Sequence, residues 1–226
     1  MKKTLRISFI LNIIIFVFVV IATIFMFTGF KFMKTNSPLL TKSNIEMFKF
    51  FTVDSNILMG IVSLVFLIYD YMFLKGMIKK IPKLVYILKL TATVGVSLTF
   101  LTTVFYLAPF AGGDFLEYFK NSNLFFHLFV PVLSIITFIF FEKTDNLSMK
   151  SVLIGIIPMV IYAIFYLVNV LVHIKNGKVD FVYDWYLFAK GGKSSIIFVF
   201  IFMILITYLI SYVLWLLNRS KLNVKE

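Results

Sequence analysis

Residues 7–30 read ISFILNIIIFVFVVIATIFMFTGF, an uncharged stretch built mainly from Ile, Val and Phe. A helix of about 20 apolar residues is long enough to cross the hydrocarbon core of a bilayer. Further apolar runs of this kind follow at roughly 50–74, 85–107, 124–141, 151–172 and 194–217. Backbone groups in lipid must be paired within the protein, which continuous runs achieve as helices. The sequence therefore predicts an all-α membrane protein, a six-transmembrane-helix bundle.

The composition supports the same fold class, because 61% of the 226 residues are hydrophobic and only 14% are charged. Soluble domains are close to half apolar, so a soluble fold is excluded. The longest connection, 173–193, is too short for a separate domain, and we expect one integral membrane domain over 1–226. The first run exceeds the apolar core of a signal peptide and no small-residue cleavage motif follows it, so we expect a retained helix.

The net charge of +12 comes largely from lysines in the short loops beside the apolar runs. Basic residues at such positions anchor helix ends and attract anionic headgroups, so we expect membrane lipids rather than nucleic acid as partners. An even number of spans places both termini on one side. The loops on the side of the termini hold more Lys and Arg per residue than the loops on the other side, when Lys89 is counted among them. The positive-inside rule therefore predicts that both termini lie inside the cell (N-in/C-in). We expect the protein in the cell (plasma) membrane.

Polar residues inside the runs fall on helical faces. In the third run Thr91, Gly95 and Thr99 recur at steps of four, a stripe of small residues that lets helices approach closely. Asp70 lies near the inner end of the second run, where we expect it to pair with a lysine of the 75–83 loop. The chain has no cysteine, which excludes disulfides, thiolate catalysis and iron–sulfur ligation.

Two runs open with a reactive polar residue: Thr52 in FFTVDSN (50–56) and His127 in FHLFVP (126–131). Polar groups are costly in hydrocarbon, so inside spans they suggest function. With N-in, both residues lie at the outer face. A threonine hydroxyl needs an adjacent base to act as a nucleophile, and histidine, which titrates near neutrality, is the natural one. Spacing alone equally allows structural roles, with Thr52 as a helix cap and His127 hydrogen-bonded at the interface.

The neighbours of these two residues supply further candidates. Ser55 and Asn56 follow Thr52 by three and four residues, so they share its helical face and could donate hydrogen bonds to an oxyanion. Asp54 points away from that face and is interpreted as an N-cap or as a partner of a neighbouring helix. Pro131 follows His127 by one turn, and its missing N–H is expected to bend the helix end toward its neighbours.

Three segments carry a resemblance to a known family. Residues 48–58 (FKFFTVDSNIL) and 126–133 (FHLFVPVL) resemble the helix-two and histidine signatures of the androgen-induced membrane hydrolases and their bacterial six-helix relatives. Residues 183–188 (YDWYLF) resemble that family's aromatic loop, which is usually richer in proline. The animal members hydrolyse fatty acid esters of hydroxy fatty acids inside the membrane. The resemblance therefore implies Thr52 as nucleophile and His127 as base.

The same resemblance makes Tyr183 and Asp184 candidates for contact with the substrate. The leading hypothesis is thus an intramembrane lipid-ester hydrolase with a threonine nucleophile and no cofactor. A non-catalytic protein for lipid binding or small-molecule transport is the alternative, motivated by the polar residues Asp54, Asp70, Asn169 and His173.

A third hypothesis is a haem protein, because His127 and His173 are expected in the same leaflet, as bis-imidazole ligation requires. We expect no other metal site, since no further His or carboxylate lies at ligand spacing from either histidine.

Overall fold

The computed structural model describes residues 2–35, 42–110, 114–145, 147–176, 178–189 and 192–219. These residues form helices and connections without a β-strand, and they include six helices long and apolar enough to cross a membrane. The six spans are Lys3–Thr28, Phe51–Leu74, Lys83–Leu107, Ser122–Phe141, Met149–His173 and Ser194–Arg219. The predicted six-helix bundle is confirmed, and the chain is an integral membrane protein by this criterion.

Half of the spans are single continuous helices. These are α1 (Lys2–Thr28), α2 (Phe51–Leu74) and α9 (Lys193–Arg219). The third span joins α3 (Lys83–Thr102) and the π-helical η2 (Thr103–Leu107), and the short α4 (Ala108–Phe110) follows it. The fourth joins α5 (Ser122–Leu124), the π-helical η4 (Phe125–Phe129), α6 (Val130–Ile136) and the π-helical η5 (Thr137–Phe141). The fifth joins α7 (Met149–Gly155) and α8 (Ile157–His173). The 3₁₀ helices η1 (Asn44–Lys49) and η3 (Phe115–Phe119) lie in the connections.

Proline shapes two of the composite spans. Pro131 has no N–H to donate to the carbonyl of His127, and the preceding turn widens so that Val130 N–H donates to the carbonyl of Phe125. The sequence analysis expected Pro131 to bend this helix end toward its neighbours; the structure shows a π-helical turn here. Pro158 interrupts the fifth span differently: the helix breaks at Ile156 and divides α7 from α8, a break that the sequence analysis did not predict.

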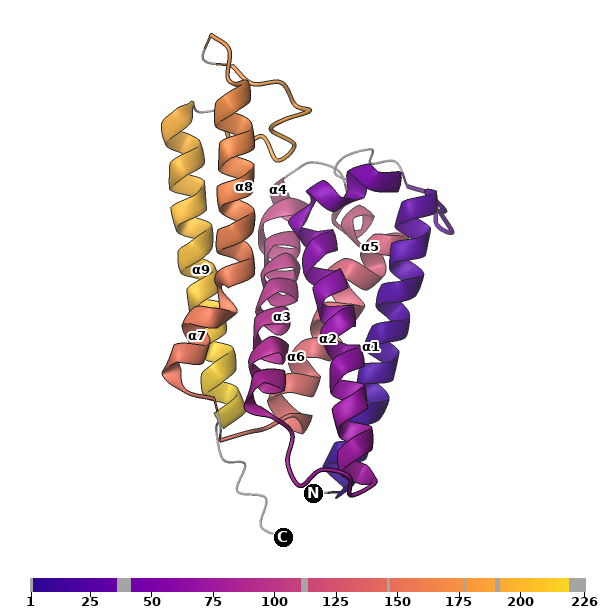
Figure 1. Ribbon diagram of the computed structural model, residues 1–226. Helices are drawn as coiled ribbons and strands as arrows, with labels where there is room; N and C mark the ends of the chain where they lie inside the picture. Colours follow the sequence, from indigo (N-terminus) through magenta and orange to yellow (C-terminus); the bar gives the residue numbers. More distant parts are fainter. Residues whose placement is uncertain are drawn as a thin grey trace.

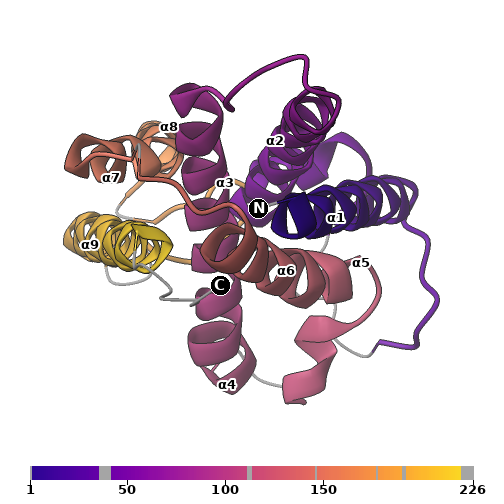
Figure 2. The same cartoon turned by 90° about the horizontal axis from the view of Figure 1, so that it is seen from below.

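Helix α3 lies in the middle of the bundle. Figure 1 shows α7, α8 and α9 on one side, and the view along the bundle in Figure 2 shows α3 between them and the group of α1, α2 and α6. Of the residues in the most apolar part of the third span, 67% are buried inside the protein, whereas the corresponding share in the other spans is 28–39%. The start of α1 and the end of α9 lie at one end of the bundle, as an even number of spans requires (Figure 1).

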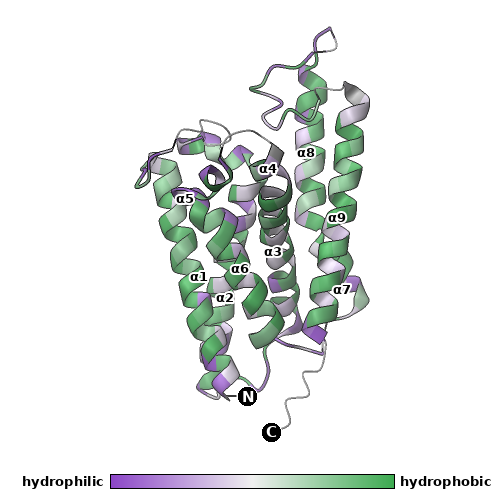
Figure 3. Ribbon diagram, turned by 180° about the vertical axis from the view of Figure 1, so that it is seen from behind, coloured by the Kyte–Doolittle hydropathy of each residue, from purple (hydrophilic) through white to green (hydrophobic). Residues whose placement is uncertain are grey.

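The outward surface of the bundle is apolar along its length. Figure 3 shows hydrophobic residues over the outward faces of the helices and hydrophilic ones mainly in the connections and at helix ends. Large side chains on α9, such as Phe198, Phe202, Leu205 and Leu209, are exposed on this surface. An apolar surface of this extent is what a lipid-facing bundle presents, because the bilayer replaces water as its solvent.

Small residues bring neighbouring helices together as the sequence predicted for the third span. A Cβ atom on Gly95 would lie 3.1 Å from the Cβ of Ser55 on α2. A Cβ atom on Gly60 would lie only 2.7 Å from Cγ1 of Val19 on α1. The absence of a side chain at Gly60 and Gly95 therefore lets α2 approach α1 and α3 closely.

Two sequence expectations are wrong in the half of the bundle that holds the termini. Lys89, counted above with the loop lysines, is an internal residue of α3 and is 0% exposed. Asp70 accepts a hydrogen bond from Ser8 and does not pair with a lysine of the 75–83 loop. Both belong to a buried set that we call the Lys89 cluster: Ser8, Asn12, Ser63, Asp70, Lys89 and Glu142. A local apolar pattern that reveals a span cannot reveal such partners, because they come from segments far apart in the sequence.

Candidate functional site

Thr52 and His127 line the same small cavity, at the end of the bundle away from the termini. The cavity has a volume of about 30 Å³, which is the space of a single water molecule. Helix α2 supplies Thr52 and η4 supplies His127, so the cavity joins the two segments that the sequence singled out. Its full lining is Met26, Phe50, Thr52, Val53, Leu107, Tyr118, Asn123, His127 and Tyr186.

Thr52 is the second residue of α2, so its backbone belongs to the first turn, where N–H groups lack intrahelical partners. The neighbouring N–H groups are used: Phe51 donates to the Tyr186 hydroxyl (3.2 Å), and Val53 and Asp54 donate to the carbonyl of Phe50 (3.0 and 3.3 Å). Neither the N–H nor the hydroxyl of Thr52 has a hydrogen-bond partner among the described residues. The positive end of the helix dipole adds to the attraction of an anion at this point.

His127 is held in one orientation by a single strong contact. Its Nδ1 lies 2.7 Å from the carbonyl oxygen of Tyr118. A carbonyl only accepts, so Nδ1 carries the proton and Nε2 of the neutral ring is an acceptor. The ring of Phe119 packs edge-on against the imidazole, with centroids 6.4 Å apart, and His127 is only 7% exposed. The imidazole is thus arranged as a base, with its free nitrogen not bonded to any described residue.

Tyr186 is a site residue that the sequence analysis missed. Its ring lines the cavity, and its hydroxyl oxygen accepts the N–H of Phe51 at the start of α2. Burial raises the pKa of the Tyr186 phenol to about 12, so the hydroxyl keeps its proton and remains a donor at physiological pH. The loop was selected from the sequence, but its contribution to the cavity comes from Tyr186 and not from Tyr183 or Asp184.

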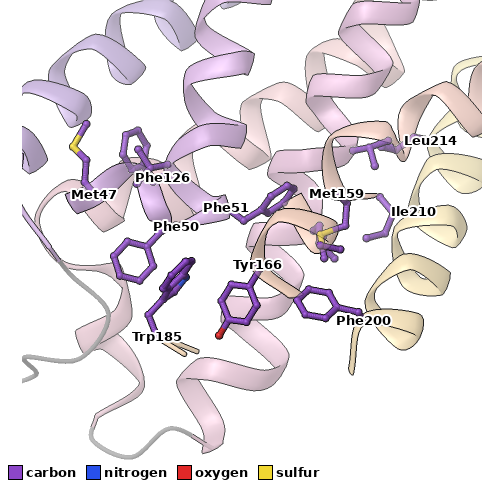
Figure 4. Close-up of a cluster of buried hydrophobic side chains, with 14 of the residues drawn as sticks. Met47, Phe50, Phe51, Phe126, Met159, Tyr166, Trp185, Phe200, Ile210 and Leu214 are labelled. Carbon is purple, nitrogen blue, oxygen red and sulfur yellow. The ribbon is translucent and has the colours of Figure 1, made fainter. Parts of the chain in front are cut away.

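Asp184 fixes the loop that carries Tyr186. It is buried, and its carboxylate accepts from the Tyr166 hydroxyl (2.6 Å) and from the N–H groups of Phe188 (2.9 Å) and Ala189 (3.0 Å). Figure 4 shows Trp185 next to Tyr166, whose ring centroids are 4.7 Å apart. The acid that the sequence analysis offered for substrate contact therefore has an internal role, anchoring the loop to α8.

Ser55 and Asn56, the oxyanion candidates of the sequence analysis, are committed to bonds between helices. The Ser55 hydroxyl lies 3.1 Å from the Thr52 carbonyl oxygen and 3.2 Å from the Thr99 hydroxyl on α3. Asn56 donates from Nδ2 to the carbonyl oxygens of Thr52 (2.7 Å) and Phe126 (3.1 Å). Both residues therefore position Thr52, and neither lines the cavity.

Asp54 is exposed near the start of α2 and is not the helix cap, because Phe50 occupies the N-cap position. Tyr183 is exposed and stacks on the imidazole of His173 at the end of α8, with ring centroids 3.6 Å apart. His173 does not line the small cavity that Thr52 and His127 share. The described residues also contain no group of three or more His, Cys, Asp or Glu side chains arranged to hold a metal ion.

A larger cavity lies beside the small one. It has a volume of about 320 Å³ and shares Met26, Tyr118 and Asn123 with the small cavity. Its remaining lining includes charged side chains, among them Lys31 and Glu117. The two cavities together offer a polar compartment next to a confined, largely apolar one.

The arrangement combines the Thr52 hydroxyl, an imidazole with a free acceptor nitrogen, the Thr52 N–H, and the Tyr186 hydroxyl, which accepts from Phe51 and also interacts with the Tyr162 hydroxyl. These are the groups that acyl transfer needs: a nucleophile, its base, and donors for a developing oxyanion. Comparisons of the chain with models of protein families, with curated proteins and with solved structures find no match.

Proposed function

We propose that the protein is an intramembrane lipid-ester hydrolase in which Thr52 is the nucleophile and His127 the base. The observation that carries the proposal is that both side chains line one cavity, with Nδ1 of His127 bonded to the Tyr118 carbonyl and Nε2 left as an acceptor. The resemblance of residues 48–58 and 126–133 to the androgen-induced membrane hydrolases supports the same roles.

The chemistry proceeds through an acyl-enzyme. Nε2 of His127 takes the hydroxyl proton of Thr52 as Oγ1 attacks the ester carbonyl carbon, and the carbonyl oxygen becomes an oxyanion. The Thr52 N–H and the Tyr186 hydroxyl donate to that oxyanion. The imidazolium returns the proton to the leaving alkoxide, which departs as the alcohol. His127 then deprotonates a water molecule that attacks the acyl group, and the fatty acid leaves as Thr52 regains its proton.

The surroundings favour a fatty-acyl ester as substrate. Phe50, Val53, Leu107 and Met26 supply apolar walls around the reacting groups, and the lipid-facing surface of the bundle is apolar. The larger cavity next to the small one supplies a polar compartment for the hydrophilic part of the lipid and for water. With the N-in/C-in orientation in the plasma membrane, which is part of the proposal, the site lies in the outer leaflet.

The test is ester turnover by the purified protein together with labelling by a fluorophosphonate probe. Thr52→Val keeps the shape of the side chain without its hydroxyl, and we expect loss of both turnover and labelling. Thr52→Ser keeps a nucleophile and should retain both. His127→Gln should lower turnover by about 10²–10⁴-fold, the usual contribution of a general base.

Thr91→Val is the matched control, because it is the same substitution at a buried hydroxyl of α3 that has no hydrogen-bond partner in the described structure. It should leave turnover unchanged. Equal turnover by the wild type, Thr52→Val and His127→Gln would exclude the enzyme.

A non-catalytic transport or lipid-binding protein is the second candidate. The observation that favours it is the buried Lys89 cluster, because charged residues inside membrane spans commonly mark pathways for ions or substrates. Flux of a solute into reconstituted vesicles that is insensitive to Thr52→Val and abolished by a change in the cluster would favour this candidate over the hydrolase.

A further inference from the structure

The Lys89 cluster lies in the half of the bundle that holds the termini, away from the candidate site. Its side chains come from α1, α2, α3 and the residue after η5, and each of them is 0–2% exposed. Lys89 forms an ion pair with Glu142 (3.2 Å) and donates to Asn12, and its ammonium lies 5.3 Å from the ring centroid of Phe66. An ammonium in hydrocarbon is costly unless paired, so this ion pair is the anchor of the cluster.

The cluster contains a second carboxylate that has no cation of its own. Asp70 is 0% exposed, and its Oδ2 faces the hydroxyl of Ser8 at 2.9 Å. The same hydroxyl lies 3.4 Å from Oε1 of Glu142. One ammonium and two ionised carboxylates leave a net charge of −1 in an environment without solvent, which is unfavourable.

The hydrogen atoms in the cluster are too few for its acceptors. Oε1 of Glu142 receives bonds from Lys89 and from Nδ2 of Asn12 (2.7 Å), but Oε2 has no partner. Oδ1 of Asp70 is likewise buried and unpartnered. The hydroxyl of Ser8 carries a single proton, so it cannot donate to both carboxylates that it faces. The structure is therefore short of one proton at this point.

We propose that the Lys89 cluster binds one proton, shared by Asp70 and Glu142 through Ser8. With the proton on Oδ2, Asp70 donates to the Ser8 oxygen and Ser8 donates to Oε1 of Glu142, so both contacts become hydrogen bonds. The charge of the cluster becomes zero, and Oδ1 becomes a neutral carbonyl oxygen, which is less costly to leave unpaired than an ionised one. This proton-binding site is independent of the proposed hydrolase.

The occupant is a proton and not a metal ion because of the charges already in place. The titratable groups that face Asp70 are Lys89 of α3, Glu142 after η5 and, more distantly, Tyr86 of α3; α1 contributes only the neutral Ser8 and Asn12. The ammonium of Lys89 occupies the oxygen of Glu142 that a metal would share, and it repels a second cation.

The experiment is infrared spectroscopy of the purified protein in detergent at neutral pH. We expect the carbonyl band of a protonated carboxylic acid, which exchanges slowly in D₂O because the group is buried. Asp70→Asn, which replaces the acid by a neutral donor of the same shape, should abolish the band. Asp145→Asn, at an exposed position, is the matched control and should leave it unchanged. Absence of the band from the wild-type protein overturns the proposal whether or not the variant folds.

A second readout is the melting temperature as a function of pH. The folded state holds a proton that an unfolded aspartate releases above about pH 4, so the melting temperature of the wild type should fall as pH rises from about 4 and level off once the folded protein has also lost the proton. Asp70→Asn should remove this slope, whereas Asp145→Asn should retain it. A different set of results would refute the proposal. If Na⁺ but not choline stabilised the wild type, if Asp70→Asn removed that stabilisation, and if the carboxylic acid band were absent, a metal cation would occupy the cluster in place of the proton.

Discussion

The Nδ2 of Asn56 donates to the carbonyl oxygen of Phe126 at 3.1 Å, and this bond ties the start of α2 to the turn that carries His127. The other proton of the same amide goes to the carbonyl of Thr52 at 2.7 Å. The Asn56 side chain thus fixes the distance between the backbone of Phe126, the residue before His127, and the backbone of Thr52. The distance between the proposed nucleophile and base depends on Asn56 although Asn56 does not line their cavity.

Asn56→Asp should separate the two helices at this point. The substitution replaces a double donor by a carboxylate facing two carbonyl oxygens, so it removes two bonds and adds repulsion in a buried place. We expect a loss of unfolding free energy of about 3 kcal/mol and a strong fall in ester turnover. Both are measured on the purified protein, and Asn176→Asp, at an exposed loop position, serves as the control. Undiminished stability of Asn56→Asp would show that the bonds to Thr52 and Phe126 are dispensable.

Tyr186→Phe tests the proposed oxyanion donor. The ring remains to line the cavity, but the hydroxyl that accepts from Phe51 is removed. Turnover should fall by about 10²–10³-fold with little change in the Michaelis constant, because the bond forms mainly in the transition state. Tyr183→Phe keeps the stacking on His173 and should be near neutral. A Tyr186→Phe variant as active as Tyr183→Phe would remove the phenol from the mechanism.

Gly60→Ala probes the contact of α1 with α2. The added Cβ would lie 2.7 Å from Cγ1 of Val19, so the helices must move apart or Val19 must shift, at a cost of about 1–3 kcal/mol. Val19→Ala removes the opposing methyl groups. The unfolding free energies of the wild type, the two single variants and the double variant form a double-mutant cycle. We expect the double variant to be more stable than the sum of the two single effects predicts. Strict additivity would place the strain elsewhere.

Lys89→Met breaks the ion pair in the buried cluster and leaves Glu142 without its cation. Removing one partner of such a pair typically costs about 3–5 kcal/mol, so the variant should unfold at a much lower temperature. Adding Glu142→Gln should restore part of the loss, because the uncompensated charge is then gone. Lys83→Met, at the exposed start of α3, is the control and should change stability by less than about 0.5 kcal/mol. A double variant no more stable than Lys89→Met would argue against charge as the cause.

The fold could be predicted from the sequence because lipid imposes one requirement on every span. Runs such as residues 7–30 are long and apolar enough that the helix is the solution that pairs all backbone groups. Helix breaks were harder to predict: Pro131 and Pro158 both interrupt a ladder, yet one widens the turn into a π-helix and the other divides α7 from α8. The outcome depends on how neighbouring helices accommodate the unpaired carbonyl, which is tertiary information.

The candidate site shows the same limit. Thr52 and His127 stood out because polar residues in apolar runs are rare, and the structure brings them to one cavity. Tyr186 did not stand out, because a loop has no periodicity that reveals which of several aromatic residues faces inward. The pairing of Lys89 with Glu142 could not be predicted either, since Lys89 lies inside the third run, Glu142 lies just beyond the fourth, and no local pattern links the two.

The carboxylate of Asp184 receives three hydrogen bonds at once, from Tyr166, Phe188 and Ala189. Because all three bonds end on one carboxylate, a substitution of Asp184 would remove them together. The Tyr186 wall of the cavity thus depends for its position on a residue that does not itself line the cavity.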